Sequence, residues 1–269
     1  MGEDAHAARH GLRDGLPAPA ARFPMRYSIL SFDLDGTLVD SAAEIAAAAN
    51  ATLLEFEVPQ RPLAQITGLI GRGTRELMLK LLEQTLMERP LRAAQLPVDE
   101  VLARFAHHYA ATAGSSAAPY PGCRETLTRL RSGGVHLACV TNKEERFAAR
   151  VLQAAGLDDC FELLVGGDSL AHKKPHPSVL AHVLSRLGGR PEDAAHVGDS
   201  RIDVETARNA GVAAWAVPWG YNGGQAIESA APQRVFQSLP EIASVVLAAN
   251  GAVREPAEPR GVAFPAARS

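Results

Sequence analysis

The stretch Tyr27-Ser28-Ile29-Leu30-Ser31-Phe32-Asp33-Leu34-Asp35-Gly36-Thr37 decides the fold of this chain. Its first six residues are mostly apolar or aromatic, and the two acidic residues, Asp33 and Asp35, come directly after them. A short apolar run of this kind predicts a buried strand. The acidic residues that follow it predict chemistry at the carboxyl end of that strand.

Helical patterns follow this first strand. Ser41 and Glu44 have the spacing of a capping box, so a helix is predicted to begin at Ser41. Further helices are predicted over Thr74–Met87 and Val98–Thr112, and no convincing strand interrupts them. Residues 41–115 therefore form a predicted small all-helical domain, inserted into the rest of the chain.

From Cys123 onward the pattern alternates between helices that end at glycine and short apolar strands. The predicted strands are Val135–Val140, Leu163–Val165, Ala194–Val197 and Ala213–Val217. This alternation predicts an α/β fold with a Rossmann-like, doubly wound parallel sheet, whose ligand site lies at the carboxyl ends of the strands. Residues 25–40 and 116–250 make up this predicted core. A flexible tail is expected over 1–24 and a disordered one over 251–269.

Composition excludes several classes of partner. The chain has 269 residues, 46% hydrophobic content, a net charge of −3 and a pI near 6.3. These values predict neither nucleic-acid binding nor attraction to an anionic membrane, and no apolar run is long enough for a membrane helix. Three cysteines without metal-ligand spacing, and no secretory signal, predict a cytoplasmic protein. A monomer or homodimer that binds a small molecule is expected.

Polar clusters stand at or shortly after the ends of predicted strands. They are Asp33–Thr37, Thr141-Asn142, Lys174-Pro175 and Gly198–Asp203. The carboxyl ends of parallel strands point the same way, so these residues are expected to converge on one crevice. Crowded carboxylates repel one another unless a cation lies among them, and Mg²⁺ prefers hard oxygen ligands and phosphate oxygens. The clusters therefore predict a site for magnesium and a phosphate group.

The ordered set Asp33-x-Asp35-Gly36-Thr37, Thr141, Lys174-Pro175 and Gly198-Asp199-x-x-x-Asp203 resembles the motifs of the haloacid dehalogenase superfamily. The resemblance spans residues 25 to about 250. It implies a phosphatase in which Asp33 attacks phosphorus to form an aspartyl-phosphate. Asp35 would act as general acid and then general base, with its backbone carbonyl facing the metal.

The same resemblance implies roles for the later motifs. Thr141 and Lys174 would bind the phosphoryl group, and Asn142 would be an extra donor near it or among the residues that support the site. Asp199 would bind the metal together with the two acids of the first motif, and Asp203 would support the site around it. The cofactor implied is Mg²⁺.

The helical insertion resembles the cap that closes over the active site in this superfamily. Three segments are similar to the phosphoglycolate phosphatase branch: Gly71-Arg72-Gly73, Gly166–Ser169 and Trp219–Asn222. This similarity makes 2-phosphoglycolate the leading substrate. A substrate that carries both phosphate and carboxylate requires a second cation, and Arg72 or Arg75 is the candidate.

Alternatives stay open. The enzyme could act on another small phosphometabolite, such as a phosphosugar or pyrophosphate, or be a β-phosphoglucomutase-like mutase with a different cap. A haloacid dehalogenase does not require Asp35. A phosphonate hydrolase requires a cap lysine, and only Lys80, expected to be buried in a leucine-rich helix, is available. A non-enzymatic phospholigand-binding protein would be expected to have lost a first-motif acid, and none is lost.

Overall fold

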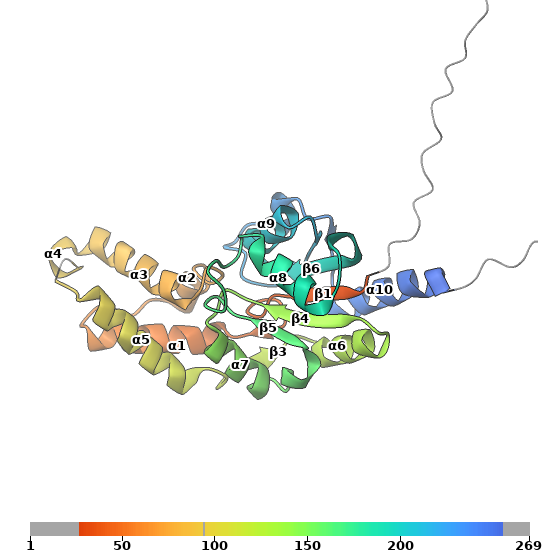
Figure 1. Ribbon diagram of the computed structural model, residues 1–269. Helices are drawn as coiled ribbons and strands as arrows, with labels where there is room; N and C mark the ends of the chain where they lie inside the picture. The colour runs from red at the N-terminus through yellow and green to blue at the C-terminus, as the bar shows by residue number, and fades with distance from the viewer. Residues whose placement is uncertain (1–26, 94, 255–269) are drawn as a thin grey trace, which may run out of the picture.

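Six parallel strands form the central sheet, in the order β5-β4-β1-β6-β7-β8 (Figure 1). The computed structural model describes residues 27–93 and 95–254, so the predicted tail over 1–24 lies outside the described residues. The strands are β1 (Ile29–Phe32), β4 (His136–Val140), β5 (Leu163–Val165), β6 (Ala194–Gly198), β7 (Ala213–Ala216) and β8 (Arg234–Val235).

Helices cover both faces of this sheet, as the doubly wound prediction requires. Helices α6 (Cys123–Ser132), α7 (Glu145–Ala154) and α10 (Leu239–Arg254) pack on one face, and α8 (Ser178–Leu187) and α9 (Arg201–Asn209) pack on the other (Figure 1). The central strand β1 contributes to both layers because its side chains alternate: Leu30 and Phe32 join one core cluster, and Ile29 joins the other. Short 3₁₀ turns η1 (Asp158–Cys160), η2 (Pro191–Asp193) and η3 (Ile227–Ala230) lie in the connections.

A group of five helices, here called the helical module, extends beyond the sheet (Figure 1). It consists of α1 (Ala42–Glu55), α2 (Leu63–Thr67), α3 (Thr74–Glu88), α4 (Pro90–Ala93) and α5 (Val98–Thr112). The module has an apolar core of its own, in which Leu53, Leu81 and Phe105 are buried. Phe147 of α7 belongs to this same cluster, so the module also packs against the sheet domain.

A two-stranded antiparallel ribbon joins the module to the sheet domain. Strands β2 (Val39–Asp40) and β3 (Ala118–Pro119) pair where the chain enters and leaves the module. The sequence did not indicate this ribbon, because each strand has only two residues. The pairing places both chain connections side by side at one point, beside the end of β1.

The predicted capping box at Ser41 is wrong, although helix α1 does begin at Ala42. The side chain of Ser41 donates to Asp35 Oδ1 instead of capping the helix. The carboxylate of Glu44 is buried, and it accepts hydrogen bonds from the Tyr109 hydroxyl at 3.2 Å and from the Gly114 backbone N–H at 2.9 Å. Tertiary partners therefore outcompete the local capping pattern.

Replacement of Glu44 by alanine is expected to lower the free energy of unfolding by about 1–3 kcal/mol, because it leaves the Tyr109 hydroxyl and the Gly114 N–H without an acceptor. Urea unfolding measures this change. Glu100→Ala, an exposed substitution on α5, is the control and is expected to stay within about 0.5 kcal/mol of wild type. Equal unfolding energies for the two variants would contradict the argument.

Two other expectations about helices need correction. Helix α10 continues to Arg254, so residues 251–254 are helical and do not belong to the predicted disordered tail, whose remainder lies outside the described residues. Lys80 is exposed and forms a 2.9 Å ion pair with Glu83, although the leucine-rich pattern predicted burial. The apolar face of α3 turns Leu77 and Leu81 inward and leaves Lys80 on the opposite side.

Candidate active site

The predicted polar residues meet at the carboxyl edge of the sheet. Asp33 follows β1, Thr141 follows β4, and Asp199 follows β6. Because β4 and β6 are the two neighbours of β1, these three strand ends lie next to each other at the point where the chain reverses its direction of winding. All three side chains are buried, as is Lys174 from the loop before α8.

Three of the acids form one cluster. Carboxylate oxygens of Asp33, Asp199 and Asp203 all lie within 4.8 Å of one another. The carboxylate of Asp35 is not part of this cluster. Burial, opposed by the nearby Lys174 ammonium, raises the pKa of Asp33 to about 6. Burial, with the charges of Asp33 and Asp203, raises the pKa of Asp199 well above its usual range.

Lys174 balances part of this negative charge. Its Nζ donates to Asp33 Oδ1 at 2.8 Å, to the carbonyl oxygen of Val140 at 2.8 Å and to Asp203 Oδ1 at 2.7 Å. Burial opposes the charged ammonium, but the two carboxylates outweigh burial and hold the pKa of Lys174 above its usual range. An ammonium has three hydrogens, so the protein itself satisfies all of them.

Both carboxylate oxygens of Asp203 accept hydrogen bonds from protein donors, which fits its predicted supporting role. Its Oδ2 accepts from the backbone N–H of Ser200 at 3.1 Å and from the Ser200 hydroxyl, and its Oδ1 accepts from Lys174 and from His196 Nε2 at 3.3 Å. His196 is buried in β6 and accepts from the Ser31 hydroxyl at 2.9 Å, so it is a hydrogen-bonded core residue. Its pKa is lowered by burial.

The donor set fits a divalent cation. Among the described residues, the Asp33 carboxylate accepts a hydrogen bond from Lys174 alone, through Oδ1. The Asp199 carboxylate accepts from the Thr37 hydroxyl at 3.1 Å and from the Tyr221 N–H. Two buried carboxylates whose ionisation is opposed by burial and by each other would be stabilised by a shared cation, and their hard oxygens suit Mg²⁺.

Two glycines allow the backbone to close around Asp199. A Cβ at Gly36 or at Gly220 would overlap the Asp199 Oδ2 atom. Gly36 also has φ +87°, a conformation that other residues rarely adopt. The backbone thus packs against this carboxylate from two sides.

Gly220→Ala is expected to reduce hydrolytic activity by at least about 10²-fold, because its methyl group would displace the Asp199 carboxylate from the acid cluster. Steady-state phosphate release measures this loss. Gly251→Ala is the control, since a Cβ there meets nothing within 4 Å. Wild-type activity in Gly220→Ala would show that the position of Asp199 is not critical.

Asp35 lies outside the cluster of Asp33, Asp199 and Asp203, toward the helical module. Its Oδ1 accepts from the Ser41 hydroxyl at 2.5 Å and from Lys143 Nζ at 2.6 Å. Among the described residues its Oδ2 has no hydrogen-bond donor. A carboxyl group held by one oxygen, with the second oxygen left for a substrate, suits a proton donor and acceptor.

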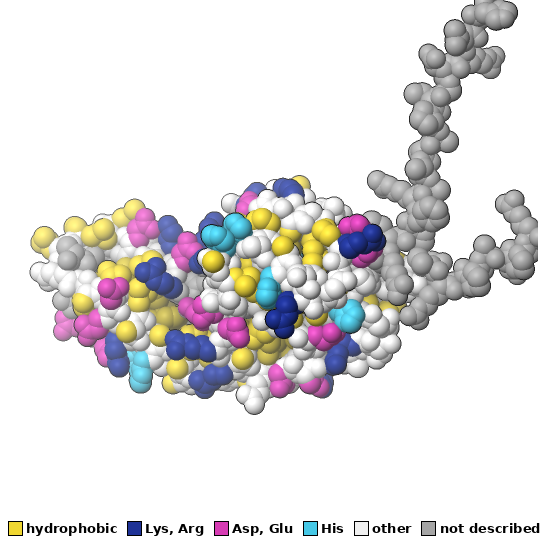
Figure 2. All heavy atoms as spheres, viewed as in Figure 1, with side chains coloured by type: hydrophobic (Ala, Val, Ile, Leu, Met, Phe, Trp, Pro, Cys, Tyr) yellow, Lys and Arg dark blue, Asp and Glu magenta, His cyan; other side chains and the backbone are white. Residues whose placement is uncertain are grey.

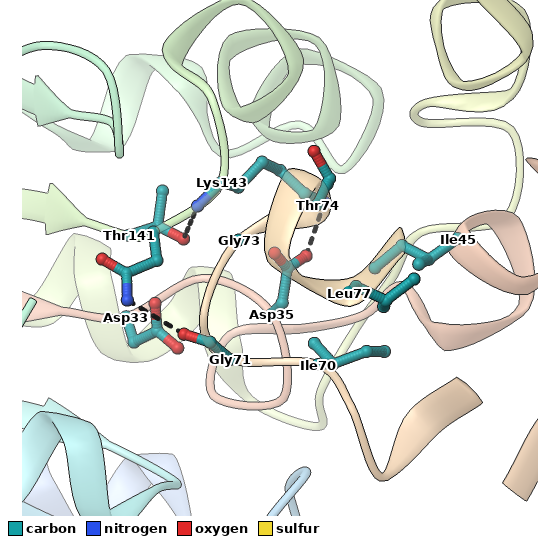
Figure 3. Close-up of a pocket in the computed structure, with 11 residues that line it drawn as sticks. Asp33, Asp35, Ile45, Ile70, Gly71, Gly73, Thr74, Leu77, Thr141 and Lys143 are labelled. Carbon is teal, nitrogen blue, oxygen red and sulfur yellow. Dashed lines mark hydrogen bonds and ion pairs between the residues drawn. The ribbon is translucent and has the colours of Figure 1, made fainter. Parts of the chain in front are cut away.

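A small cavity lies between the strand ends and the module (Figure 3). Its volume is about 20 Å³, which is room for about one water molecule. The residues that line it are Asp33, Asp35, Ile45, Ile70, Gly71, Gly73, Thr74, Leu77, Thr141, Asn142 and Lys143. It therefore combines the first-motif acids and one cation with apolar side chains from the module and with two of the phosphate-binding candidates, Thr141 and Asn142, whereas Lys174 does not line it.

The predicted cap loop reaches this cavity only in part. Gly71 and Gly73 line it, with φ values of +122° and +94° that favour glycine. Arg72 does not line it and is exposed, and its carbonyl oxygen accepts a 2.6 Å hydrogen bond from Lys173 Nζ. The turn at the two glycines leaves Arg72 outside the cavity, so Arg72 does not supply the second cation in this arrangement. Lys173 also pairs with Glu76 at 3.2 Å, so it connects the sheet domain with the module.

The contacts of Asn142 fit a supporting position, which was one of its two expected places. Its side-chain nitrogen donates to the carbonyl oxygen of Gly71 at 3.0 Å and to that of Lys174 at 3.1 Å. Both side-chain hydrogens are therefore used within the protein and are not available to a phosphate group. Asn142 connects the module loop to the loop that carries Lys174, while Thr141 lines the cavity.

Sequence reasoning missed two partners in this region. Lys143 is buried beside Asp35, and Glu144 accepts a 2.6 Å hydrogen bond from the Thr74 hydroxyl of α3. The scarcity of lysine, with four in the chain, was the signal that could have identified Lys143. No sequence signal indicated the Thr74–Glu144 contact, because it joins residues that are 70 positions apart.

Comparisons with known proteins show the family of this chain. Residues 30–217 match the family of haloacid dehalogenase-like hydrolases. The phosphoglycolate phosphatase of Nitrosospira multiformis is 40% identical over 228 residues, covering 83% of this chain and 97% of that protein. Phosphoglycolate phosphatase 1 of Pseudomonas aeruginosa is 37% identical, covering 84% of this chain and 81% of that protein. The chain belongs to the haloacid dehalogenase-like hydrolase family.

Solved structures show the same fold. The crystal structure of a predicted phosphoglycolate phosphatase from Haemophilus somnus superimposes with a TM-score of 0.75 at 29% identity, and it covers 81% of this chain and 97% of that protein. None of the described helices is both long and apolar enough to cross a membrane.

Proposed function

We propose that this protein is a magnesium-dependent phosphomonoester hydrolase that acts on 2-phosphoglycolate through an aspartyl-phosphate on Asp33. The observation that carries this proposal is the arrangement of two carboxylates at one cavity. Asp33 is held at Oδ1 by Lys174, and Asp35 is held at Oδ1 by Lys143 and Ser41. Each therefore keeps its second oxygen for chemistry, and both line the same small space.

In the first step, a carboxylate oxygen of Asp33 attacks phosphorus, and the bond between phosphorus and the ester oxygen breaks. Asp35 gives its proton to that oxygen, so glycolate leaves as the alcohol. In the second step, Asp35 takes a proton from water, which attacks phosphorus and releases inorganic phosphate. The bond between phosphorus and the Asp33 oxygen breaks, so Asp33 is again a carboxylate and Asp35 is again protonated. Thr141 would donate a hydrogen bond to a phosphoryl oxygen.

Asp33, Asp199 and the backbone carbonyl of Asp35 would hold Mg²⁺. The bound ion would offset the negative charge of the phosphoryl oxygens beside these acids. Lys174 fixes the orientation of Asp33, and Asp203 fixes Lys174 through a 2.7 Å ion pair.

The helical module would act as a cap over this site. Apolar side chains from the module line the cavity and exclude water, and the closed cavity is too small for any phosphate ester. The module would therefore move to admit substrate and close again over it. The names of the similar proteins support 2-phosphoglycolate. A cytoplasmic location and a monomeric or homodimeric state stay predictions from the sequence.

Phosphate release from a substrate panel tests the proposal. The panel holds 2-phosphoglycolate, phosphosugars, nucleotides, pyrophosphate and phosphoserine, each with Mg²⁺ and with EDTA. Turnover that requires Mg²⁺ and is fastest with 2-phosphoglycolate is the expected result. Fastest turnover of another ester would replace the substrate and keep the mechanism, and turnover in EDTA would overturn the metal assignment. Phosphoryl transfer between positions of a hexose phosphate would instead identify a mutase.

A further inference from the structure

Lys143 places a buried ammonium group inside the candidate active site. The residue is 2% exposed and lines the same cavity as Asp33 and Asp35. Its Nζ lies 2.6 Å from Asp35 Oδ1 and 5.2 Å from the centre of the Tyr109 ring. It is the only cationic side chain among the residues that line this cavity.

The hydrogens of this ammonium are not all used by the protein. Among the described residues, Asp35 is the only hydrogen-bond acceptor of Lys143 Nζ, and the Tyr109 ring faces the ammonium as a cation–π partner. The nearby Lys174, in contrast, donates hydrogen bonds to three protein oxygens, one for each of its three hydrogens. Lys143 is buried and thus retains donor capacity where an unused donor is costly.

We infer that Lys143 forms the subsite for the carboxylate of the substrate, an inference that rests on the proposed phosphatase function. The substrate class is a phosphate monoester with a carboxylate close to the ester oxygen. Asp35 protonates the ester oxygen in the proposed mechanism, and Lys143 contacts Asp35 directly. An anionic group that reaches Lys143 must therefore be near that oxygen, as it is when a single carbon separates the two.

The surroundings of Lys143 strengthen this selectivity. Ile45, Ile70 and Leu77 also line the cavity, and their side chains offer no hydrogen bonds to sugar hydroxyls. The burial of Lys143 also strengthens the attraction between its ammonium and a carboxylate. Arg72 and Arg75, the cations that the sequence indicated, are exposed and do not line the cavity. Lys143 therefore replaces them as the second cation.

The test compares two esters that differ only in the carboxylate: 2-phosphoglycolate and 2-hydroxyethyl phosphate. Wild type, Lys143→Met and Lys143→Arg are assayed for kcat/KM on both, with Lys80→Met as the matched control because Lys80 is an exposed lysine outside the cavity. In Lys143→Met the ratio of the two kcat/KM values is expected to fall by roughly 10- to 100-fold, because a charge-assisted hydrogen bond is lost. Lys143→Arg is expected to restore part of the ratio, and Lys80→Met is expected to leave it unchanged.

The remaining outcomes separate this inference from the proposed function. If Lys143→Met slows both esters equally and keeps the wild-type ratio, Lys143 only positions Asp35 and the carboxylate subsite is wrong. Competitive inhibition by inorganic phosphate shows whether the variant retains a folded phosphoryl site; inhibition within about threefold of wild type is expected, a difference of under 1 kcal/mol. If wild type releases phosphate from neither ester, the proposed function fails and this inference fails with it.

Discussion

Asp33→Asn is expected to abolish phosphate release, with a loss of at least about 10⁴-fold in kcat, because an amide oxygen does not replace the carboxylate that attacks phosphorus. The variant is expected to stay folded. Burial raises the pKa of Asp33 to about 6, so the folded protein opposes the charge that this substitution removes. The midpoint of thermal unfolding should therefore be equal to or higher than that of wild type.

Two measurements make this result specific. Phosphate release gives the activity, and circular dichroism during heating gives the unfolding midpoint. Asp99→Asn, an exposed substitution on α5, is the matched control and is expected to keep wild-type activity. Substantial turnover by Asp33→Asn would overturn the assignment of the nucleophile. A large drop in its unfolding midpoint would show instead that the carboxylate is needed for the fold.

Lys174→Met is expected to have the largest effect on stability. The substitution leaves two buried carboxylates, those of Asp33 and Asp203, without their ammonium partner. Loss of one member of a buried ion pair costs about 3–5 kcal/mol. Urea unfolding at pH 7 in EDTA, which removes any contribution of metal binding, measures this difference. Phosphate release should be lost as well, because Asp33 is no longer oriented.

The stability loss in Lys174→Met depends on pH in a defined direction. Burial opposes the charged form of Asp203, but the Lys174 ammonium and His196 outweigh burial and hold the pKa of this carboxyl below its usual range. In wild type, the ionised Asp203 therefore adds to the free energy of unfolding at pH values above its unfolded-state pKa of about 4. This contribution is lost only at lower pH. Without Lys174, burial favours the protonated carboxyl of Asp203. The difference in free energy of unfolding between variant and wild type should therefore shrink as pH falls from about 7 toward 4.

Lys80→Met is the control for this experiment, since it removes an exposed lysine in a surface ion pair. Its effect is expected to stay within about 1 kcal/mol. A Lys174→Met variant as stable as Lys80→Met would mean that the acid cluster does not depend on Lys174. If the difference in free energy of unfolding between Lys174→Met and wild type grows as the pH falls, the assigned charge state of Asp203 is wrong.

Strand positions and strand-end motifs were predictable because they depend on local patterns. Strand β5 was predicted with its observed bounds, and the predictions for β4 and β6 differ from the observed strands by one residue at one end. Apolar runs that end at glycine or at a polar residue define such strands without any tertiary information. Asp33, Thr141 and Asp199 were found for the same reason, since each stands at or just beyond a strand end.

Side-chain partners could not be predicted in the same way. The pattern Ser41–Glu44 matched a capping box, yet Glu44 accepts bonds from Tyr109 and Gly114, far along the chain. Arg72 stood in the expected cap loop, but the turn at its flanking glycines leaves its side chain outside the cavity. Such outcomes depend on how the module packs on the sheet domain.

By itself the sequence determined the class of fold, the order of its motifs and the residues at the carboxyl ends of β1, β4 and β6, because hydrophobic periodicity and turn residues act over a few positions. Only the tertiary structure decided how these residues are used. It brought Lys143 to Asp35 and turned Asn142 toward Gly71. Contacts between residues about 70 to 110 positions apart produced these pairings, and local sequence patterns do not encode which distant side chains will meet.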